Sequence, residues 1–221
     1  DEPDQPASPL PEITYKRLAE LSRGMATGFD ELGLETGARV AMVSHNAARL
    51  LVFLFGSSAF GRVGVPINFR LSAAEIQYIL DHSGAEVLFI DPELADEHGS
   101  FNVKHQFVVG PESDQIFVEG GVPKPWIPDE SATATINYTS GTTARPKGVE
   151  MTHRNIWLNA AVFGWQAGVS DRDVYLHTLP MFHCNGWGMP YAMTGMGGQH
   201  IVLRKVCLLY TSPSPRDLST P

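Results

Sequence analysis

The chain has 221 residues, of which 43% are hydrophobic and 18% charged, and its formal net charge is −8. This length and composition are typical of a globular protein with one large or two small domains. Because the balance is acidic and no segment gathers Lys and Arg, nucleic acid is not expected as a partner.

The sequence shows no pattern of a membrane span or of a secretory signal. The apolar run Leu50–Phe60 is too short to cross a bilayer, for which about 20 apolar residues are needed. The start, Asp1–Pro11, lacks the basic and apolar regions of a secretory signal, and it also lacks an initiator Met. The two cysteines, Cys184 and Cys207, are too few for a disulfide framework and favour a reducing compartment. We therefore expect a cytoplasmic protein without a membrane span.

Strand-like and helix-like patterns alternate through the first part of the chain. In chain order they predict a helix over Thr14–Leu32, a strand over Arg39–Ser44, a helix over Asn46–Phe60, a strand over Val65–Asn68, a helix over Ser72–His82 and a strand over Glu86–Ile90. Such alternation favours βαβ crossovers. The predicted fold class is therefore α/β, a mainly parallel sheet with helices on both faces.

Regular patterns fade over Asp91–Ser131, and within this segment Gly120–Pro128, with three prolines and two glycines, is predicted to be surface connection. They return as strands over Thr133–Tyr138, Val149–Thr152, Val174–Thr178 and Gln199–Arg204, and as a helix over Asn155–Gln166.

The end of the chain departs from these patterns. Cys207–Asp217, CLLYTSPSPRD, follows a strand-like run and brings in prolines and serines that suit no regular element. It matches, residue for residue, the translation of a transposon-based sequencing-library adapter. We therefore expect 207–221 to be an unstructured artefact and 1–206 to be one partial domain, truncated at both ends. An ordinary Pro/Ser-rich linker is the alternative.

The most informative stretch is Tyr138–Val149, YTSGTTARPKGV. A strand-like run leads into the small residues Thr139–Thr143, whose backbone N–H groups and hydroxyls suit an anion, and Lys147 can add a full positive charge. The nucleotide P-loop differs, since there a Ser or Thr follows the Lys and a helix comes next, whereas here Gly148 follows and a strand is predicted. A solvated linker is the alternative for such a composition.

A second group of reactive side chains lies in Leu179–Trp187, where His183 precedes Cys184. The pair suggests a metal ligand set or a nucleophile with its base, but a zinc site needs three or four ligands. A packed histidine beside a buried thiol is the reading that the residues alone favour. Gly186 would permit close approach of the backbone.

Tyr138–Val149 resembles the signature loop of the adenylate-forming (AMP-binding) superfamily, which includes acyl-CoA synthetases, luciferases and peptide-synthetase adenylation domains. The family pattern is Tyr-Thr-Ser-Gly-Thr-Thr-Gly-x-Pro-Lys-Gly-Val, and Ala144 stands where Gly is usual. If that position needs a positive φ, Ala144 is strained at a cost on the order of 1 kcal/mol. Further segments in family order are Thr14-Tyr15, Gly37–Val40 and Gly64–Asn68. The resemblance implies that 1–206 is part of the large N-terminal AMP-binding domain.

The resemblance also implies roles for individual residues. The ATP phosphates would be held by Thr139, Ser140, Gly141, Thr142, Thr143 and Lys147, with Thr139 as the Mg²⁺ contact. Leu179–Trp187 resembles the segment that borders the carboxylate being activated. There His183 would orient or shield the acid, while Cys184, Gly186 and Trp187 would line the acyl entrance.

The implied activity is that of an AMP-forming carboxylic acid–CoA ligase. A short-chain, medium-chain or aryl-alkyl acid would react with ATP and coenzyme A, through an acyl-adenylate and with Mg²⁺, to give acyl-CoA, AMP and pyrophosphate. The family's adenine- and ribose-binding groups and its catalytic Lys have no counterpart before Val206, so no certain catalytic residue is assigned and the chain is expected to be inactive alone. Alternatives are an adenylation domain that loads a carrier protein and a non-catalytic nucleotide-binding module. Full-length relatives are often homodimers.

Overall fold

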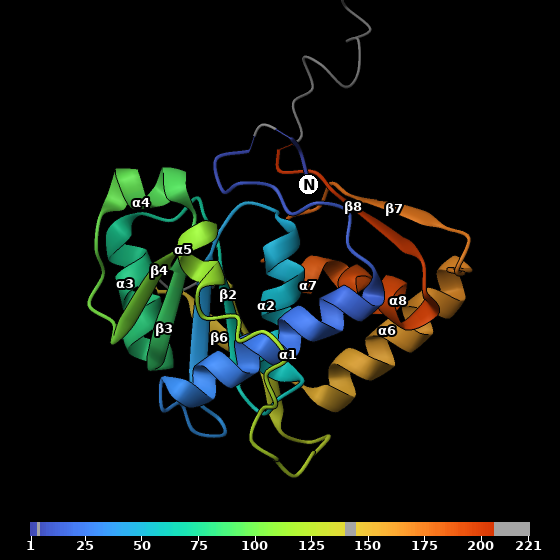
Figure 1. Ribbon diagram of the computed structural model, residues 1–221, viewed down its shortest axis with the longest axis horizontal. Helices are drawn as coiled ribbons and strands as arrows, with labels where there is room; N and C mark the ends of the chain where they lie inside the picture. The colour runs from blue at the N-terminus through green and yellow to red at the C-terminus, as the bar shows by residue number, and fades with distance from the viewer. Residues whose placement is uncertain (4, 140–144, 206–221) are drawn as a thin grey trace, which may run out of the picture.

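The computed structural model describes residues 1–3, 5–139 and 145–205 (Figure 1). Several residues named above lie outside these ranges: Ser140, Gly141, Thr142, Thr143, Ala144 and the segment 207–221. Within the described ranges, none of the helices has both the length and the hydropathy that crossing a membrane requires.

The centre of the molecule is a six-stranded sheet in the order β4-β3-β1-β2-β5-β6. Its strands are β1 Arg39–Val43, β2 Val63–Ile67, β3 Ala85–Ile90, β4 His105–Val108, β5 Thr133–Thr139 and β6 Lys147–Thr152. Neighbouring strands are parallel except for β6, which is antiparallel to β5. The predicted α/β class with a mainly parallel sheet is confirmed.

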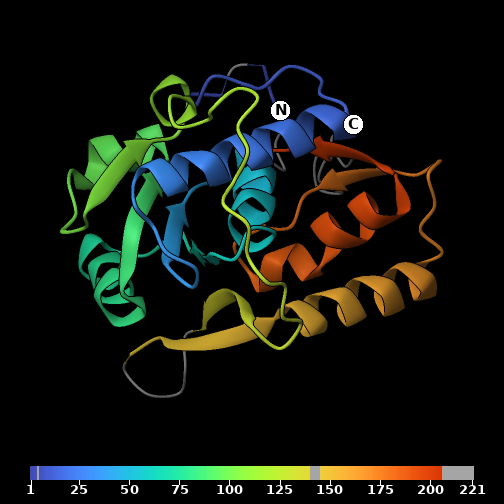
Figure 2. The same cartoon turned by 60° about the horizontal axis from the view of Figure 1, so that its bottom comes forward.

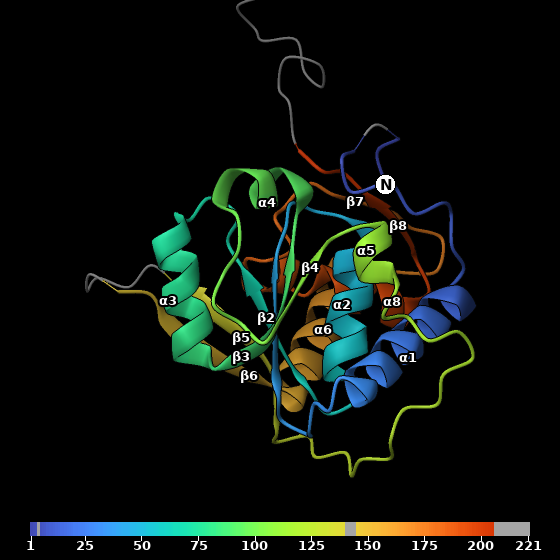
Figure 3. The ribbon, with the colours of Figure 1, turned by 60° about the vertical axis from the view of Figure 1, so that its left-hand side comes forward.

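Helices cover both faces of this sheet because each buried strand alternates its side chains between two apolar clusters. On one face Val40 and Met42 pack with α1 Tyr15–Glu31 and α2 Ala48–Ser58. On the other face Ala41 and Val43 pack with α3 Ala73–Ser83. Figure 3 shows α3 on the opposite side of the sheet from α1 and α2.

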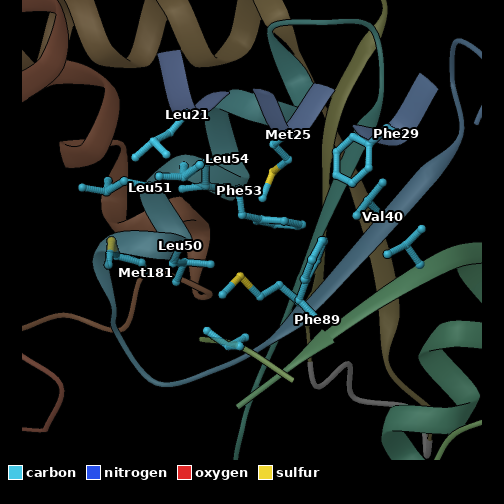
Figure 4. Packing of buried hydrophobic residues seen from close by; sticks show 14 of the residues in the cluster. Leu21, Met25, Phe29, Val40, Leu50, Leu51, Phe53, Leu54, Phe89 and Met181 are labelled. Carbon is cyan, nitrogen blue, oxygen red and sulfur yellow. The ribbon is translucent and has the colours of Figure 1, made fainter. Parts of the chain in front are cut away.

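The larger cluster lies between α1, α2 and the sheet (Figure 4). Phe53 of α2 and Phe89 of β3 meet edge to face, with 6.2 Å between ring centroids, and Phe29 of α1 lies at the same distance from Phe89. Met181, from a segment far along the chain, reaches the edge of this cluster and is fully buried. The core of the sheet therefore anchors the segment that leads to His183.

The helix starts follow the capping signals of the sequence. Thr14 caps α1 by accepting a hydrogen bond from the backbone of Arg17, and Ser72 and Glu75 form a reciprocal capping box at the start of α3. Helix α6, His153–Ala167, begins before its predicted start because Thr152 caps it.

Gly120–Pro128 is irregular and lies at the surface, as predicted, but part of Asp91–Ser131 before it is regular, although no periodicity was found there. The segment holds α4 Pro92–His98, β4 His105–Val108 and α5 Pro111–Asp114. These elements are short and β4 is only half-buried at the edge of the sheet, so their apolar periodicity is too weak to be seen in the sequence.

A smaller unit follows the hairpin of β5 and β6. Strands β7 Val174–His177 and β8 Gln199–Val202 form a separate parallel pair. The short α7 Cys184–Trp187 and the helix α8 Met189–Met196 connect them. Figure 2 shows α6 running alongside α8, and Gly164 of α6 faces Ala192 and Met196 of α8, where an added Cβ would make ordinary contacts.

Candidate functional site

The predicted phosphate loop connects a β-hairpin at the edge of the main sheet. Strand β6 returns antiparallel to β5, and the register pairs Thr139 with Lys147 and Tyr138 with Gly148. Of the predicted phosphate-binding residues, Thr139 and Lys147 are described, and they lie opposite each other at the base of the loop. The predicted strand after Lys147 is present, so the connection differs from a P-loop.

Both residues at the base of the loop are exposed. The ion pairs among the described residues join other side chains and leave the Lys147 ammonium group unpaired within the part of the chain that the structure describes. An exposed ammonium group without a carboxylate partner can bind a phosphate oxygen without first breaking an ion pair.

Helix α3 supports the loop from both ends. Just before the loop, the Tyr138 hydroxyl lies 2.8 Å from Nδ1 of His82, and burial raises the pKa of this tyrosine. Just after it, the Arg145 guanidinium lies over the ring of Tyr78, 5.5 Å from the centroid. Sequence reasoning missed these supports, although Tyr78 and His82 are one helical turn apart and share a face.

The segment predicted to border the acid forms a left-handed turn. Cys184, Asn185, Gly186 and Trp187 all have positive φ angles, between 47° and 61°. Such angles cost roughly 1–2 kcal/mol for each residue with a Cβ, so the surrounding contacts must hold the turn in place.

His183 and Cys184 are both exposed, with 3.7 Å between His183 Nε2 and Cys184 Sγ. The reading of a packed histidine beside a buried thiol is therefore wrong. The residue that this turn buries is Asn185, whereas His183 precedes the turn in an extended conformation. Within the described ranges, no third metal-binding side chain joins this pair.

A buried polar network fixes the turn to strand β5. Asn137 donates from Nδ2 to Oδ1 of Asn185 at 3.1 Å and to the backbone oxygen of Phe182 at 3.3 Å. Asn185 donates in turn to Oγ1 of Thr135 at 2.9 Å. The three network side chains are at most 5% exposed. Polar residues at alternate positions of a buried strand, Thr135 and Asn137, were the signal that sequence reasoning passed over.

Asn46 holds the chain that leads into the same turn. This residue follows β1, and its Oδ1 accepts from the backbone N–H of Met181 at 2.8 Å, while its Nδ2 donates to the backbone oxygens of His177 and Leu179. Next to it, the His45 ring stacks on Phe69 with 4.0 Å between centroids. The loop after β1 thus holds the backbone that leads into the acid-bordering turn. Sequence reasoning missed this role of Asn46.

A pocket of about 290 Å³ opens beside the turn. Its wall includes Cys184 and Trp187 from the predicted set, together with Met151 of β6 and Phe163 of α6. His183 and Gly186 are adjacent in sequence but do not line it. The lining is largely apolar, which suits a hydrocarbon group.

An ion pair fills the crevice between the carboxyl ends of β1 and β3, where open α/β sheets commonly bind ligands. Arg204 donates to both carboxylate oxygens of Asp91, at 2.7 and 2.8 Å, and to Glu93 at 2.8 Å. Burial alone would raise the pKa of the Asp91 carboxyl, but the hydrogen bonds from Arg204 outweigh this and hold the pKa below its usual value. His45, Asp91 and Glu93 are close enough together to hold a metal ion. Because Arg204 already binds these carboxylates, we assign no ligand to this crevice.

The chain belongs to the AMP-binding enzyme family, which it matches over residues 2–216, and it falls in the acyl-CoA ligase branch.

Two curated relatives show which enzymes this chain resembles. It is 30% identical to an acetate/butyrate–CoA ligase of Arabidopsis thaliana, with 88% of this chain and 40% of the relative aligned. It is 35% identical to a long-chain-fatty-acid–CoA ligase of Thermus thermophilus, with 86% and 37% aligned. The chain therefore spans about two fifths of the length of these curated relatives.

The crystal structure of a long-chain-fatty-acid–CoA ligase from Archaeoglobus fulgidus has a similar fold. Its TM-score is 0.84 at 26% identity, covering 95% of this chain and 43% of that one. The mostly parallel sheet is that of the N-terminal domain of adenylate-forming enzymes.

Proposed function

We propose that this chain forms the ATP-phosphate and acid-binding part of an AMP-forming carboxylic acid–CoA ligase. The substrate is a short-chain, medium-chain or aryl-alkyl acid. Family membership supports the reaction class, and the names of the relatives, which run from acetate/butyrate to long-chain fatty acid, support a carboxylic acid as substrate.

The proposed reaction has two steps. A carboxylate oxygen attacks the α-phosphorus of ATP, the bond to pyrophosphate breaks, and the acyl-adenylate forms. The thiol of coenzyme A then attacks the acyl carbon, AMP leaves with the former carboxylate oxygen, and the thiol proton passes to solvent. In this scheme Lys147 stabilises the charge on the phosphates, and the pocket beside Trp187 holds the hydrocarbon part of the acid.

The residues at the hairpin are compatible with Mg²⁺. Thr139 offers one exposed hydroxyl oxygen, a hard ligand of the kind that Mg²⁺ accepts. Mg²⁺ usually keeps several waters and binds substrate phosphates, so a single protein oxygen at this position is sufficient. When bound, the ion would neutralise phosphate charge.

The network of Asn137, Asn185 and Thr135 is the observation that carries this proposal. It joins the strand that enters the phosphate loop to the turn that borders the acid pocket. Adenylation needs the carboxylate and the α-phosphorus to be held at a fixed distance, and a rigid connection between the two binding segments serves that need.

Binding of ATP to this chain tests the proposal. We expect calorimetry with Mg²⁺-ATP to show binding, and Lys147→Gln to weaken it about tenfold, as expected for loss of a charge-assisted hydrogen bond of about 1.4 kcal/mol. Lys124→Gln is the matched control, because Lys124 is also exposed and lies in the connection before β5. Equal affinities of the two variants would remove Lys147 from the phosphate site.

We further propose that this chain alone does not turn over acid, ATP and coenzyme A. The family holds adenine and ribose with further side chains and uses a catalytic Lys. None of these groups has a counterpart in residues 1–205. Release of AMP or pyrophosphate from the purified chain with a panel of acids would contradict this.

A further inference from the structure

The pocket beside Trp187 has a larger apolar neighbour. A groove of about 510 Å³ lies between α2, α6 and α8, three helices that Figure 3 shows together. Ile156 of α6 and Tyr191 of α8 line both the pocket and the groove. The two hollows therefore share one wall, made by these two side chains.

Tyr191 is held in this wall by its ring and not by its hydroxyl. The ring meets Phe55 of α2 edge to face, with 5.4 Å between centroids and 77° between planes. The hydroxyl is shielded from water and faces the Ser58 side chain of α2, but within the described ranges it makes no hydrogen bond of normal geometry. A buried polar group without a partner is unfavourable, so packing or function has to account for its place.

Beyond the wall, small side chains leave room. Ala160 and Ala161 of α6 and Ala192 and Gly195 of α8 line the groove, and a Cβ added at Gly195 would meet nothing within 4 Å. Alkyl groups favour such a lining because it removes them from water without requiring polar partners.

We propose that the pocket and the groove are two compartments of one site for the alkyl chain of the carboxylic acid, and that Tyr191 separates them and so sets the longest chain that binds. This inference rests on the proposed function and adds the residue that decides chain length. The occupant follows from continuity, because Tyr191 lines the same pocket as Cys184 and Trp187 and also lines the groove.

A series of straight-chain acids, from butyrate to decanoate, tests the separation. Each methylene that enters an apolar compartment strengthens binding about fourfold. In the unmodified chain we expect affinity to rise with length and then stop rising when the pocket is full. In Tyr191→Ala the rise should continue to acids longer by at least about two carbons. Tyr191→Phe is the matched control. It keeps the ring, so affinity should stop rising at the same chain length as in the unmodified chain, and this length is called the break below.

Filling the groove separates this effect from a general loosening of the protein. In Tyr191→Ala/Gly195→Leu, the new side chain occupies the groove from a position with open space, so the break should return to shorter acids. Two tryptophans report on the compartments, since Trp187 lines the pocket and Trp157 lines the groove. Fluorescence of the Trp187→Phe and Trp157→Phe variants then shows which compartment an acid enters.

The outcomes are distinct. If no acid binds the unmodified chain, the acid-binding part of the proposed function fails and this inference fails with it. If short acids bind but Tyr191→Ala keeps the original break, only the separation by Tyr191 is wrong. If Tyr191→Ala does not fold, Ile156→Val is the substitute, because it removes one methyl group from the same wall. The inference is also overturned if affinity in Ile156→Val stops rising at the original chain length and decanoate does not change the fluorescence of Trp157.

Discussion

Asn137 and Asn185 are 48 residues apart in the chain, yet their side-chain amides meet in a hydrogen bond of 3.1 Å inside the protein. The bond joins strand β5, which enters the phosphate loop, to the left-handed turn beside the apolar pocket. Because both side chains are buried and bonded to further groups, the two segments form one rigid unit.

Loss of either amide should destabilise the protein. Asn137→Ala leaves the Asn185 carbonyl without its partner, and we expect the free energy of unfolding to fall by about 1–3 kcal/mol. Asn185→Gly should have a similar cost, and glycine is chosen because φ is 49° there. Urea denaturation of both variants and the double variant gives the coupling energy. Additive losses would mean that the bond contributes nothing of its own.

The ion pair of Arg204 and Asp91 should be intolerant of single changes. Arg204→Met leaves the Asp91 carboxylate buried without its main partner, and we expect a loss of about 3–5 kcal/mol. The double variant Arg204→Met/Asp91→Asn should recover most of it, since no fully buried charge then remains, and the partly exposed Glu93 carboxylate keeps Lys205 as its partner. Chemical denaturation measures both, and a double variant as unstable as the single one would contradict the interpretation.

A buried histidine, His177, and a half-buried one, His200, should make stability depend on pH. His177 Nε2 lies 2.8 Å from His200 Nδ1. Burial lowers the pKa of His177 to about 3, helped by the neighbouring His200, and burial lowers the pKa of His200 to about 4. In the unfolded chain both titrate near 6.5. The unfolded state therefore binds more protons between these values, and stability is complete above about pH 6.5 and is lost as the pH falls toward 4 and 3.

Most carboxylates titrate below about 4.5, so unfolding measured between pH 7.5 and 5 isolates the histidines. We expect a slope approaching about 1.4 kcal/mol per pH unit for each histidine below pH 6. His200→Gln should reduce this slope. An unchanged slope would assign the dependence to other groups, of which His153, whose pKa burial also lowers, is the first to examine.

Two glycines in helices should respond to alanine in opposite directions. A Cβ at Gly28 of α1 would lie 2.0 Å from the backbone oxygen of Ile116, whereas one at Gly195 of α8 meets nothing within 4 Å. Gly28→Ala should therefore cost about 1–3 kcal/mol by overpacking. Gly195→Ala should gain up to about 1 kcal/mol from helix propensity. Thermal unfolding of both variants measures these changes in stability. If Gly28→Ala were stabilised, the backbone at Ile116 would have to move aside at little cost.

Elements with strong local signals were predictable from the sequence. Helix α1 has apolar residues on one face and the cap Thr14, and helix α3 has the Ser72 capping box, so pattern and structure agree. The short elements between Asp91 and Ser131 were not predictable, because few of their residues are buried. The left-handed turn at Cys184–Trp187 also escaped prediction, since long-range bonds hold residues with a Cβ at φ values that their own preferences disfavour.

For the candidate site, the sequence identified which segments matter but not how they are joined. Lys147 and Trp187 were named from their motifs, and they lie at the hairpin and at the pocket. Asn46 bonds to the backbone of Met181, 135 residues further on. No local pattern reports a pairing over such a separation, so the residues that position the site emerge only from the fold.

Strand β6 ends the main sheet, and in the described part of the chain its outer edge has no partner. An open edge of this kind can recruit the strand of another molecule, and exposed charges are a common protection against it. Lys147 and Glu150 are exposed on this strand. We therefore expect that an apolar residue at position 147 makes this chain more prone to self-association, whether or not nucleotide binds.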